Sequence, residues 1–178
     1  MSIEQVRSYL KRWNRDTDII EMEASTATVL EAANALGVIP ARIAKSISLR
    51  QGGGGVPVGG APVGAMVIVV AGDVKLDNRK YKDHFGVKAK MLSPEEALQF
   101  TGHAVGGVCP FGLPPELPVY LDVSMKRFTT VFPACGSGNS AIELTLDELN
   151  EYSQNKEWVD VCKPIEAQYP PIGGNGNT

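Results

Sequence analysis

The chain has 178 residues, of which 43% are hydrophobic and 21% charged, and these are ordinary values for a soluble globular protein of one domain. Its three cysteines are far apart and odd in number, which argues against a disulfide framework and predicts a reducing, cytoplasmic compartment. No apolar run reaches the roughly 20 residues of a membrane span, and the formal net charge of −3 excludes nucleic-acid binding through bulk charge alone.

Helical and extended patterns alternate in the first part of the chain. Ser2 and Thr28 stand where helix N-caps are expected, and Gly37 stands where a helix-ending glycine belongs. Pro40 opens a short turn that brings Lys45 to the start of a strand. The predicted elements here are, in order, a helix over 3–13, a strand over 18–23, a helix over 29–36 and a strand over 46–50.

Residues 51–64 are rich in glycine, proline and valine and lie between two predicted strands. We interpret them as an extended hairpin loop that is a passive insertion. No lysine follows the glycines, so the segment lacks the pattern of a phosphate-binding P-loop.

Short strands and capped helices continue through the second part. Ser93 and Thr145 each precede a glutamate by three residues, which is the capping-box spacing. The predicted elements are strands over 64–71, 87–92, 119–122, 129–134 and 140–144, and helices over 77–85, 93–101 and 145–153. Without regular βαβ spacing, this order predicts an α/β fold of the α+β type, a mixed sheet with helices packed on it. The composition of 164–178 predicts a disordered tail after a single domain of 1–163.

The familiar catalytic motifs are missing. His84 and His103 have no further ligands at metal-binding spacing, so we expect no metal and no cofactor. Cys109 is a candidate nucleophile with His103 as its base, although a small apolar loop residue is the simpler interpretation. The lysines and arginine of 75–90 form either a local patch for tRNA or an ordinary solvated face.

A lysine and a glycine loop remain as candidates. Lys45 lies among apolar residues, where a surface lysine at a strand start is the alternative. The adjacent Gly106 and Gly107 allow close backbone approach, while Pro110 restricts Cys109 to an extended conformation. Such a loop can hold main-chain N–H groups toward a carbonyl or oxyanion, or it is only a structural turn.

The chain resembles the YbaK family and the related insertion domain of bacterial prolyl-tRNA synthetases. The resemblance spans about residues 20–160 and rests on blocks in the family's order. Its loop block fits the family's G-x-x-x-P pattern from Gly106 to Pro110. The blocks are Glu31–Gly37, Arg42–Ser46, Ser93–Glu96 with Thr101–Gly102, Gly106–Leu113, Val119–Asp122, Ala134–Gly136 and Ile142–Leu144.

This resemblance implies a barrel-like mixed sheet surrounded by helices and the hydrolysis of a mischarged aminoacyl-tRNA, usually a proline tRNA carrying a small wrong amino acid. Attack would come from water or a ribose hydroxyl, without a protein nucleophile. The partners would be the acceptor end of tRNA and prolyl-tRNA synthetase. The positions carried over are Lys45, Gly106 and Gly107 as catalytic, and Ser46, Val108, Cys109, Pro110, Ala134, Cys135 and Gly136 as substrate-binding.

The sequence also departs from that family. Ala141 replaces an acidic residue of the cysteine-specific members, and no histidine stands near Asn139 or Ser140 as in the insertion domains. The amino acid removed therefore stays open. A non-catalytic module that binds tRNA or a synthetase through a degraded site is the alternative function, and a hydrolase using the Cys109 thiol is a third.

Overall fold

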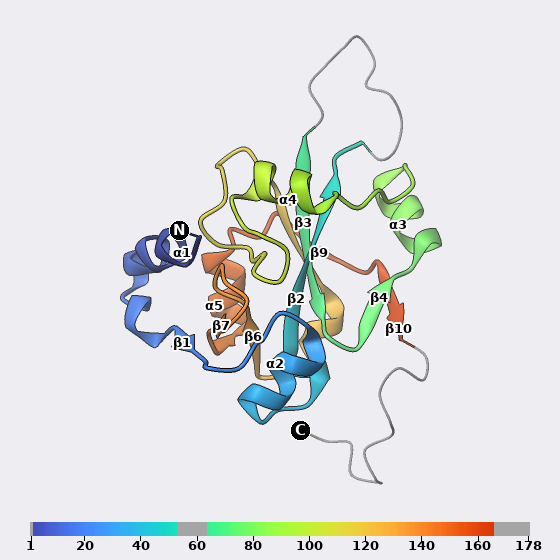
Figure 1. The fold of residues 1–178 in the computed structure, drawn as a ribbon. Coiled ribbons are helices and arrows are strands. Elements are labelled where there is room, and N and C mark those ends of the chain that lie inside the picture. The colour runs from blue at the N-terminus through green and yellow to red at the C-terminus, as the bar shows by residue number, and fades with distance from the viewer. Residues whose placement is uncertain (1, 53–63, 166–178) are drawn as a thin grey trace, which may run out of the picture.

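The structure is a computed structural model that describes residues 2–52 and 64–165. Its centre is a curled, mixed sheet of six strands in the order β8-β6-β2-β3-β5-β9 (Figure 1). The α+β prediction, a mixed sheet with helices packed on it, is confirmed. The strands are β2 (Ile43–Arg50), β3 (Ala65–Ala71), β5 (Val119–Asp122), β6 (Thr130–Pro133), β8 (Leu144–Thr145) and β9 (Trp158–Val159).

The antiparallel pair β2–β3 forms the middle of this sheet, with a regular register from Ala44↔Ala71 to Arg50↔Ala65. All of β3 is buried, as expected for a continuous run of apolar residues. On the outer sides of the β2–β3 pair, β5 runs parallel to β3 and β6 runs parallel to β2. The register also shows that residues 51–64 join an antiparallel pair, as the hairpin prediction requires, although 53–63 lie outside the described residues.

Two small antiparallel sheets flank the large one. One pairs β1 (Ile20–Glu21) with β7 (Ser140–Ala141), and the other pairs β4 (Val74–Leu76) with β10 (Cys162–Pro164). The second sheet uses the start of the segment predicted to be a tail, because Pro164 pairs with Val74. Residues 166–178 lie outside the described part, so the disordered tail and the single domain of 1–163 stay predictions.

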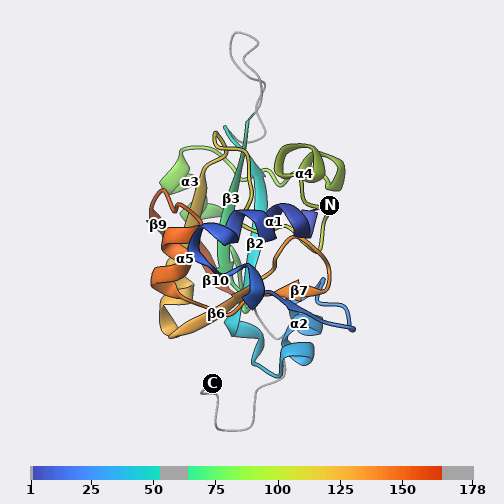
Figure 2. The same ribbon diagram turned by 90° about the vertical axis from the view of Figure 1, so that its left-hand side faces the viewer.

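Five α-helices surround the sheet in the described ranges. In Figures 1 and 2, α1 and α5 lie together on one side of β2 and β3, and α3 lies with β4 and β10 on the other. In the view of Figure 1, α2 lies at the lower end of the sheet and α4 beside its upper end. No helix among these residues is long and apolar enough to cross a membrane. The bounds are α1 (Ser2–Leu10), α2 (Val29–Leu36), α3 (Asn78–Phe85), α4 (Pro94–Thr101) and α5 (Leu146–Tyr152).

Most predicted helix ends are confirmed. The Thr28 hydroxyl accepts a hydrogen bond from the Glu31 amide, and Gly37 ends α2 with φ of +70°. Ser93 and Thr145 both form complete capping boxes. Ser2 is an exception, because α1 already includes it and its hydroxyl bonds His103 Nδ1 instead of a helix amide.

Three strand predictions are wrong in extent. The strand predicted over 18–23 is reduced to β1, because Asp16–Asp18 form a 3-10 turn. Residues 87–92 form only one bridge, Met91 to Leu49, since two hydrogen bonds tie this segment to β2. The predicted strand over 140–144 is divided into β7 and β8, because the chain changes partner there: β7 pairs with β1 and β8 with β6. Strands β4, β9 and β10 are only two or three residues long and left no periodic signal.

Candidate active site

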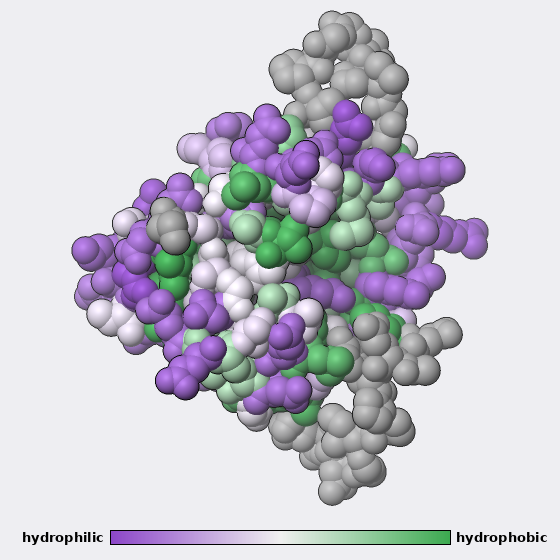
Figure 3. Space-filling model, in the orientation of Figure 1, coloured by the Kyte–Doolittle hydropathy of each residue, from purple (hydrophilic) through white to green (hydrophobic). Residues whose placement is uncertain are grey.

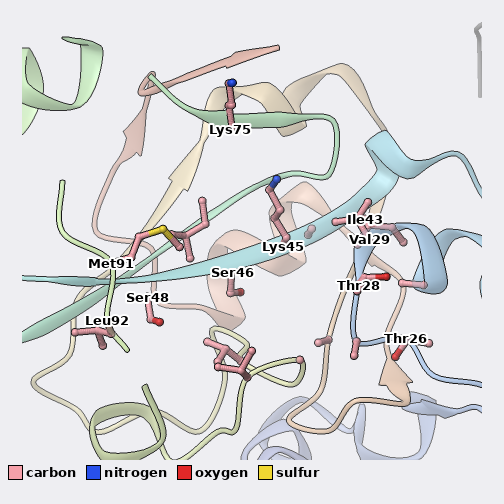
Figure 4. A pocket seen from close by; sticks show the side chains of 18 of the residues that line it. Thr26, Thr28, Val29, Ile43, Lys45, Ser46, Ser48, Lys75, Met91 and Leu92 are labelled. Atoms are coloured by element: carbon pink, nitrogen blue, oxygen red, sulfur yellow. The ribbon is translucent and has the colours of Figure 1, made fainter. Parts of the chain in front are cut away.

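The first element of the site is the start of β2. A 3-10 turn at Pro40–Arg42 leads into the strand, which begins at Ile43, so Lys45 lies within the strand and pairs with Val70 of β3. Successive side chains of a strand point to opposite faces. Accordingly, Lys45 points to one side of β2, toward β4, and Ser46 and Ser48 point to the other (Figure 4).

The edge of β2 that faces away from β3 is covered except around Ser46. On one side of it, β6 pairs with Ile43 and Ala44. On the other, Leu92 donates its N–H to the Ser48 oxygen at 3.1 Å, and Arg50 donates to the Lys90 oxygen at 2.8 Å. In a strand, the main-chain N–H and C=O groups of every second residue face the same edge. Ser48 and Arg50 bond at this edge, so the N–H and C=O of Ser46 also face it and point into the opening between the two covered stretches.

A cavity of about 780 Å³ occupies this opening. Figure 3 shows the molecule from the same side as Figure 1, with apolar surface at the centre and hydrophilic side chains around it, above all on the side of α3. The lining of the cavity combines small and apolar residues with a few polar groups. The lining includes Thr26, Thr28, Val29, Ala32, Ile43–Ser48, Lys75, Leu76, Asn78, Ala89, Met91, Leu92, Pro94, Val105, Gly106, Val108, Phe132, Ala134, Ser140 and Ala141.

The structure brings half of the predicted site residues to this cavity. Those in its lining are Lys45, Ser46, Gly106, Val108 and Ala134. The other five lie elsewhere. Cys109 and Cys135 are completely buried, Pro110 lines a second cavity of about 300 Å³, and Gly107 packs against Gly136.

The two glycines of the loop have different surroundings. Gly106 has φ of +96°, a conformation that favours glycine, and its α-carbon faces Ala27 beside the cavity. Gly107 packs so tightly that a Cβ there would lie 2.7 Å from the Gly136 carbonyl carbon and the Ser137 nitrogen. Its N–H donates to the Ala104 oxygen at 2.9 Å, so in this conformation it is not directed at a substrate.

Two residues of the cavity lining carry hydroxyls that have no hydrogen-bond partner in the described ranges. They are Oγ1 of Thr26 and Oγ of Ser46, both shielded from solvent. Thr26 is only 7% exposed and lies across the cavity from β2 (Figure 4). Since buried polar groups nearly always have a partner, unpaired ones beside a cavity are candidate ligand contacts. Sequence reasoning missed Thr26, which sits in an unremarkable polar stretch before α2.

The electrostatic environment of Lys45 differs from that of a surface lysine. Burial lowers the pKa of its ammonium, and the neighbouring Cys162 and Asp73 oppose this shift. Lys45 takes part in none of the ion pairs among the described residues. Its charge is therefore available to a bound anion or carbonyl oxygen.

Cys109 and His103 are close but do not form a nucleophile–base pair. The Cys109 sulfur lies 3.6 Å from Nε2 of His103, which is 2.8 Å from the Phe111 oxygen. A carbonyl oxygen can only accept, so Nε2 carries the proton and cannot take one from the thiol. Burial also raises the pKa of the Cys109 thiol to about 12. These features support the interpretation of Cys109 as a small apolar residue.

The positions at which the sequence departs from the resembled family lie in or beside the cavity. Ala141 and Ser140 are in its lining. Asn139 is directed away, since its side-chain amide donates to the Met22 oxygen at 3.0 Å. The small Ala141 therefore leaves an apolar wall at this end of the cavity.

Comparisons with known proteins agree on one family. The model described as "Aminoacyl-tRNA editing domain" matches residues 23–152. The chain is 55% identical to the uncharacterized protein YwhH of Bacillus subtilis (strain 168), over 93% of this chain and all of that protein. It is 29% identical, over 63% of each chain, to EbsC of Enterococcus faecalis (strain ATCC 700802 / V583), which is provisionally named a Cys-tRNA(Pro)/Cys-tRNA(Cys) deacylase.

A solved structure agrees as well. A crystal structure provisionally titled as a trans-editing enzyme for prolyl tRNA synthetase superimposes with a TM-score of 0.76 and 29% identity, over 91% of this chain and 97% of that one.

Proposed function

Because the chain belongs to the aminoacyl-tRNA editing domain family, we propose that its central cavity binds the ester end of a mischarged aminoacyl-tRNA and promotes hydrolysis of that ester. The observation that carries the proposal is that one cavity is lined by a lysine outside every ion pair of the described residues, by a glycine loop, and by two residues whose hydroxyls have no partner in the same ranges. An enzyme that needs no protein nucleophile is consistent with Cys109 lying buried outside it.

In the proposed reaction, the oxygen of a water molecule, or first the vicinal ribose hydroxyl, attacks the ester carbonyl carbon. The bond between this carbon and the ribose oxygen breaks, and the ribose oxygen takes up a proton. When water attacks, its proton goes to the leaving ribose oxygen, and the products are the free amino acid and uncharged tRNA. When the vicinal hydroxyl attacks first, the acyl group moves to that oxygen as a new ester, and water then cleaves this ester in the same way. Main-chain donors aimed at the developing oxyanion are worth about 100- to 1000-fold each.

The proposed roles of the chain's own groups follow from their positions. Lys45 offers a positive charge to a phosphate or carbonyl oxygen of the substrate. The N–H of Ser46, directed into the opening in the sheet edge, is a donor for the ester carbonyl. Gly106 supplies the close backbone approach beside it, while Gly107 holds the loop against the Gly136 turn. Together these groups position the ester, which suffices for an already activated bond.

We propose a small amino acid on proline tRNA as the substrate. The names given to EbsC and to the protein of the solved structure, which mention Cys-tRNA(Pro) and prolyl tRNA synthetase, support this. The wall made by Ala32, Ala134 and Ala141 is compatible with a small side chain. A synthetase partner would explain how a chain of net charge −3 obtains its tRNA specificity.

The test is to measure deacylation of proline tRNA charged with alanine, cysteine, serine or threonine by the purified chain and by Lys45→Ala. We expect hydrolysis of at least one substrate above its spontaneous rate and a loss of about 10- to 100-fold in the variant, as for a lost charged contact. Tight tRNA binding without hydrolysis of any substrate would instead establish the alternative, a binding module.

A further inference from the structure

Two lysines face each other next to the cavity. In the register of β4 and β10, Lys75 is directly opposite Lys163. Directly opposed side chains of an antiparallel pair share one face, with Cβ atoms about 4.5–5.5 Å apart, and like charges in these positions are destabilising. Neither lysine belongs to any ion pair among the residues the structure describes. Their charges are therefore brought together without a close ion pair, and Asp77 is the carboxylate that senses the charge of Lys163.

The Lys75–Lys163 pair adds positive charge to the side of the site on which Lys45 lies. Lys75 is in the lining of the cavity. Figure 4 shows that Lys45 and Lys75 extend to the same side of β2, opposite to Ser46 and Ser48. Lys45 on β2 and Lys75 on β4 thus both line the cavity, and Lys163 on β10 lies directly opposite Lys75; these three residues are the lysine row.

The charged residues nearby are mostly engaged with other partners. Asp73 accepts two hydrogen bonds from Arg127, at 2.6 and 3.0 Å. The Asp77 carboxylate caps α3, although it also feels the charge of Lys163. Lys80, which lies on α3 close to this sheet, pairs with Asp160 at 3.1 Å. The lysine row keeps a local excess of positive charge in a chain that is acidic overall.

Resting on the proposed function, we propose that Lys75 and Lys163 form a phosphate subsite for the single-stranded 3′ end of the tRNA. A single strand carries one phosphodiester charge per nucleotide, and lysines bind phosphates as flexible point charges. The nucleotides then leave the cavity over β4 and β10, and the aminoacyl group occupies the opposite end, between Thr26 and Ala141. Strand β10 lies beyond residues 23–152, so Lys163 is outside the part of the chain that the editing-domain model matches.

The experiment compares Lys75→Gln, Lys163→Gln and the double variant with the wild type on one mischarged tRNA. We expect KM to rise about 3- to 10-fold for each substitution and kcat to stay the same, since only phosphate binding is lost. The slope of log(kcat/KM) against log[salt] should become shallower by about 0.7 for each lysine removed. Lys11→Gln, an exposed lysine beside α1 on the other side of the sheet, is the matched control and should change neither quantity.

A second substrate separates phosphate binding from disruption of the site. An aminoacyl ester of adenosine carries no phosphate, so all four variants should hydrolyse it as the wild type does. Unchanged KM and salt slope with tRNA, or equal losses on both substrates, would overturn the subsite. If the wild type hydrolyses neither substrate, the proposed function fails on its own, and the same change of salt slope in direct tRNA binding still decides the inference.

Discussion

His103 Nε2 donates a hydrogen bond of 2.8 Å to the main-chain oxygen of Phe111, so one buried ring joins the two ends of the loop that contains Gly106 and Gly107. The other ring nitrogen accepts from the Ser2 hydroxyl, which ties the same loop to the first helix. The His103 ring is completely buried. The loop beside the cavity is therefore held by a neutral imidazole with both nitrogens occupied.

Replacing His103 with alanine should lower the free energy of unfolding by about 2–4 kcal/mol. The variant leaves a cavity and two unpaired groups, the Phe111 oxygen and the Ser2 hydroxyl. Urea denaturation followed by fluorescence measures the change. A loss below about 0.5 kcal/mol would show that this ring does not hold the loop.

The same ring should make stability depend on pH. Burial lowers the pKa of His103, with the Phe111 hydrogen bond opposing. The unfolded chain then binds a proton at a higher pH than the folded one, so the free energy of unfolding decreases as pH falls below about 6.5, toward the lowered pKa. We expect this decrease in the wild type and a flatter profile in His103→Ala. Parallel profiles would contradict the assignment.

Lys45 should impose an alkaline limit on activity. Because burial lowers its pKa, its ammonium is lost at a lower pH than that of an exposed lysine. The value of kcat/KM, corrected for spontaneous ester hydrolysis, should therefore fall with rising pH, and the fall should begin below the pH range in which an exposed lysine titrates (about 10.4). In Lys45→Arg, whose guanidinium stays charged, any residual activity should lack this fall. If the alkaline fall in kcat/KM has the same midpoint in the wild type and in Lys45→Arg, a group other than Lys45 causes it.

Thr26 and Thr101 offer a matched pair of buried threonines. The Thr26 hydroxyl has no partner among the described residues, whereas that of Thr101 donates to the Ala97 oxygen at 2.6 Å and accepts from the His103 amide at 3.0 Å. Thr26→Val should keep or raise the free energy of unfolding by up to about 1 kcal/mol, and Thr101→Val should lower it by about 1–3 kcal/mol. If the Thr26 hydroxyl binds substrate, its variant also raises KM. A larger loss of stability from Thr26→Val than from Thr101→Val would show that Thr26 has a structural partner.

Gly107 and Gly86 separate close packing from backbone strain. A Cβ at Gly107 would lie 2.7 Å from main-chain atoms of Gly136 and Ser137, whereas one at Gly86, with φ of +77°, meets nothing within 4 Å. Gly86→Ala should therefore cost about 1 kcal/mol, from its left-handed conformation alone. Gly107→Ala should cost at least about 2 kcal/mol more, because main-chain atoms must move. Thermal unfolding of the two variants tests the order, and equal shifts would contradict it.

The elements with a strong local signal were predictable. The caps at Thr28, Ser93 and Thr145 and the apolar run of β3 each have a physical cause within a few residues. The short strands β4, β9 and β10 were not, because pairing with distant segments decides them. Pro164 belongs to β10 only because β4 lies beside it, and nothing in its composition indicates this.

The candidate site was predictable in part for the same reason. Lys45 and Gly106 stand in recognisable blocks, and both line the cavity. That Cys109 is buried while Val108 beside it reaches the cavity depends on how the loop folds over His103. The unpaired hydroxyl of Thr26 and the opposition of Lys75 to Lys163 arise only from tertiary packing, so no spacing rule could have found them.

The break in the covering of β2 has a consequence for how the protein behaves in solution. The unpaired main-chain groups of an uncovered strand edge can form hydrogen bonds with a strand of another molecule, and such pairing leads to aggregation. Here β6 and the segment around Met91 protect the edge on both sides of Ser46. Adding a foreign strand needs several consecutive residues, and the interruption is too short for that. The main-chain groups of Ser46 can thus bind one small ligand group, but the opening is too short for an extended polypeptide to pair with β2.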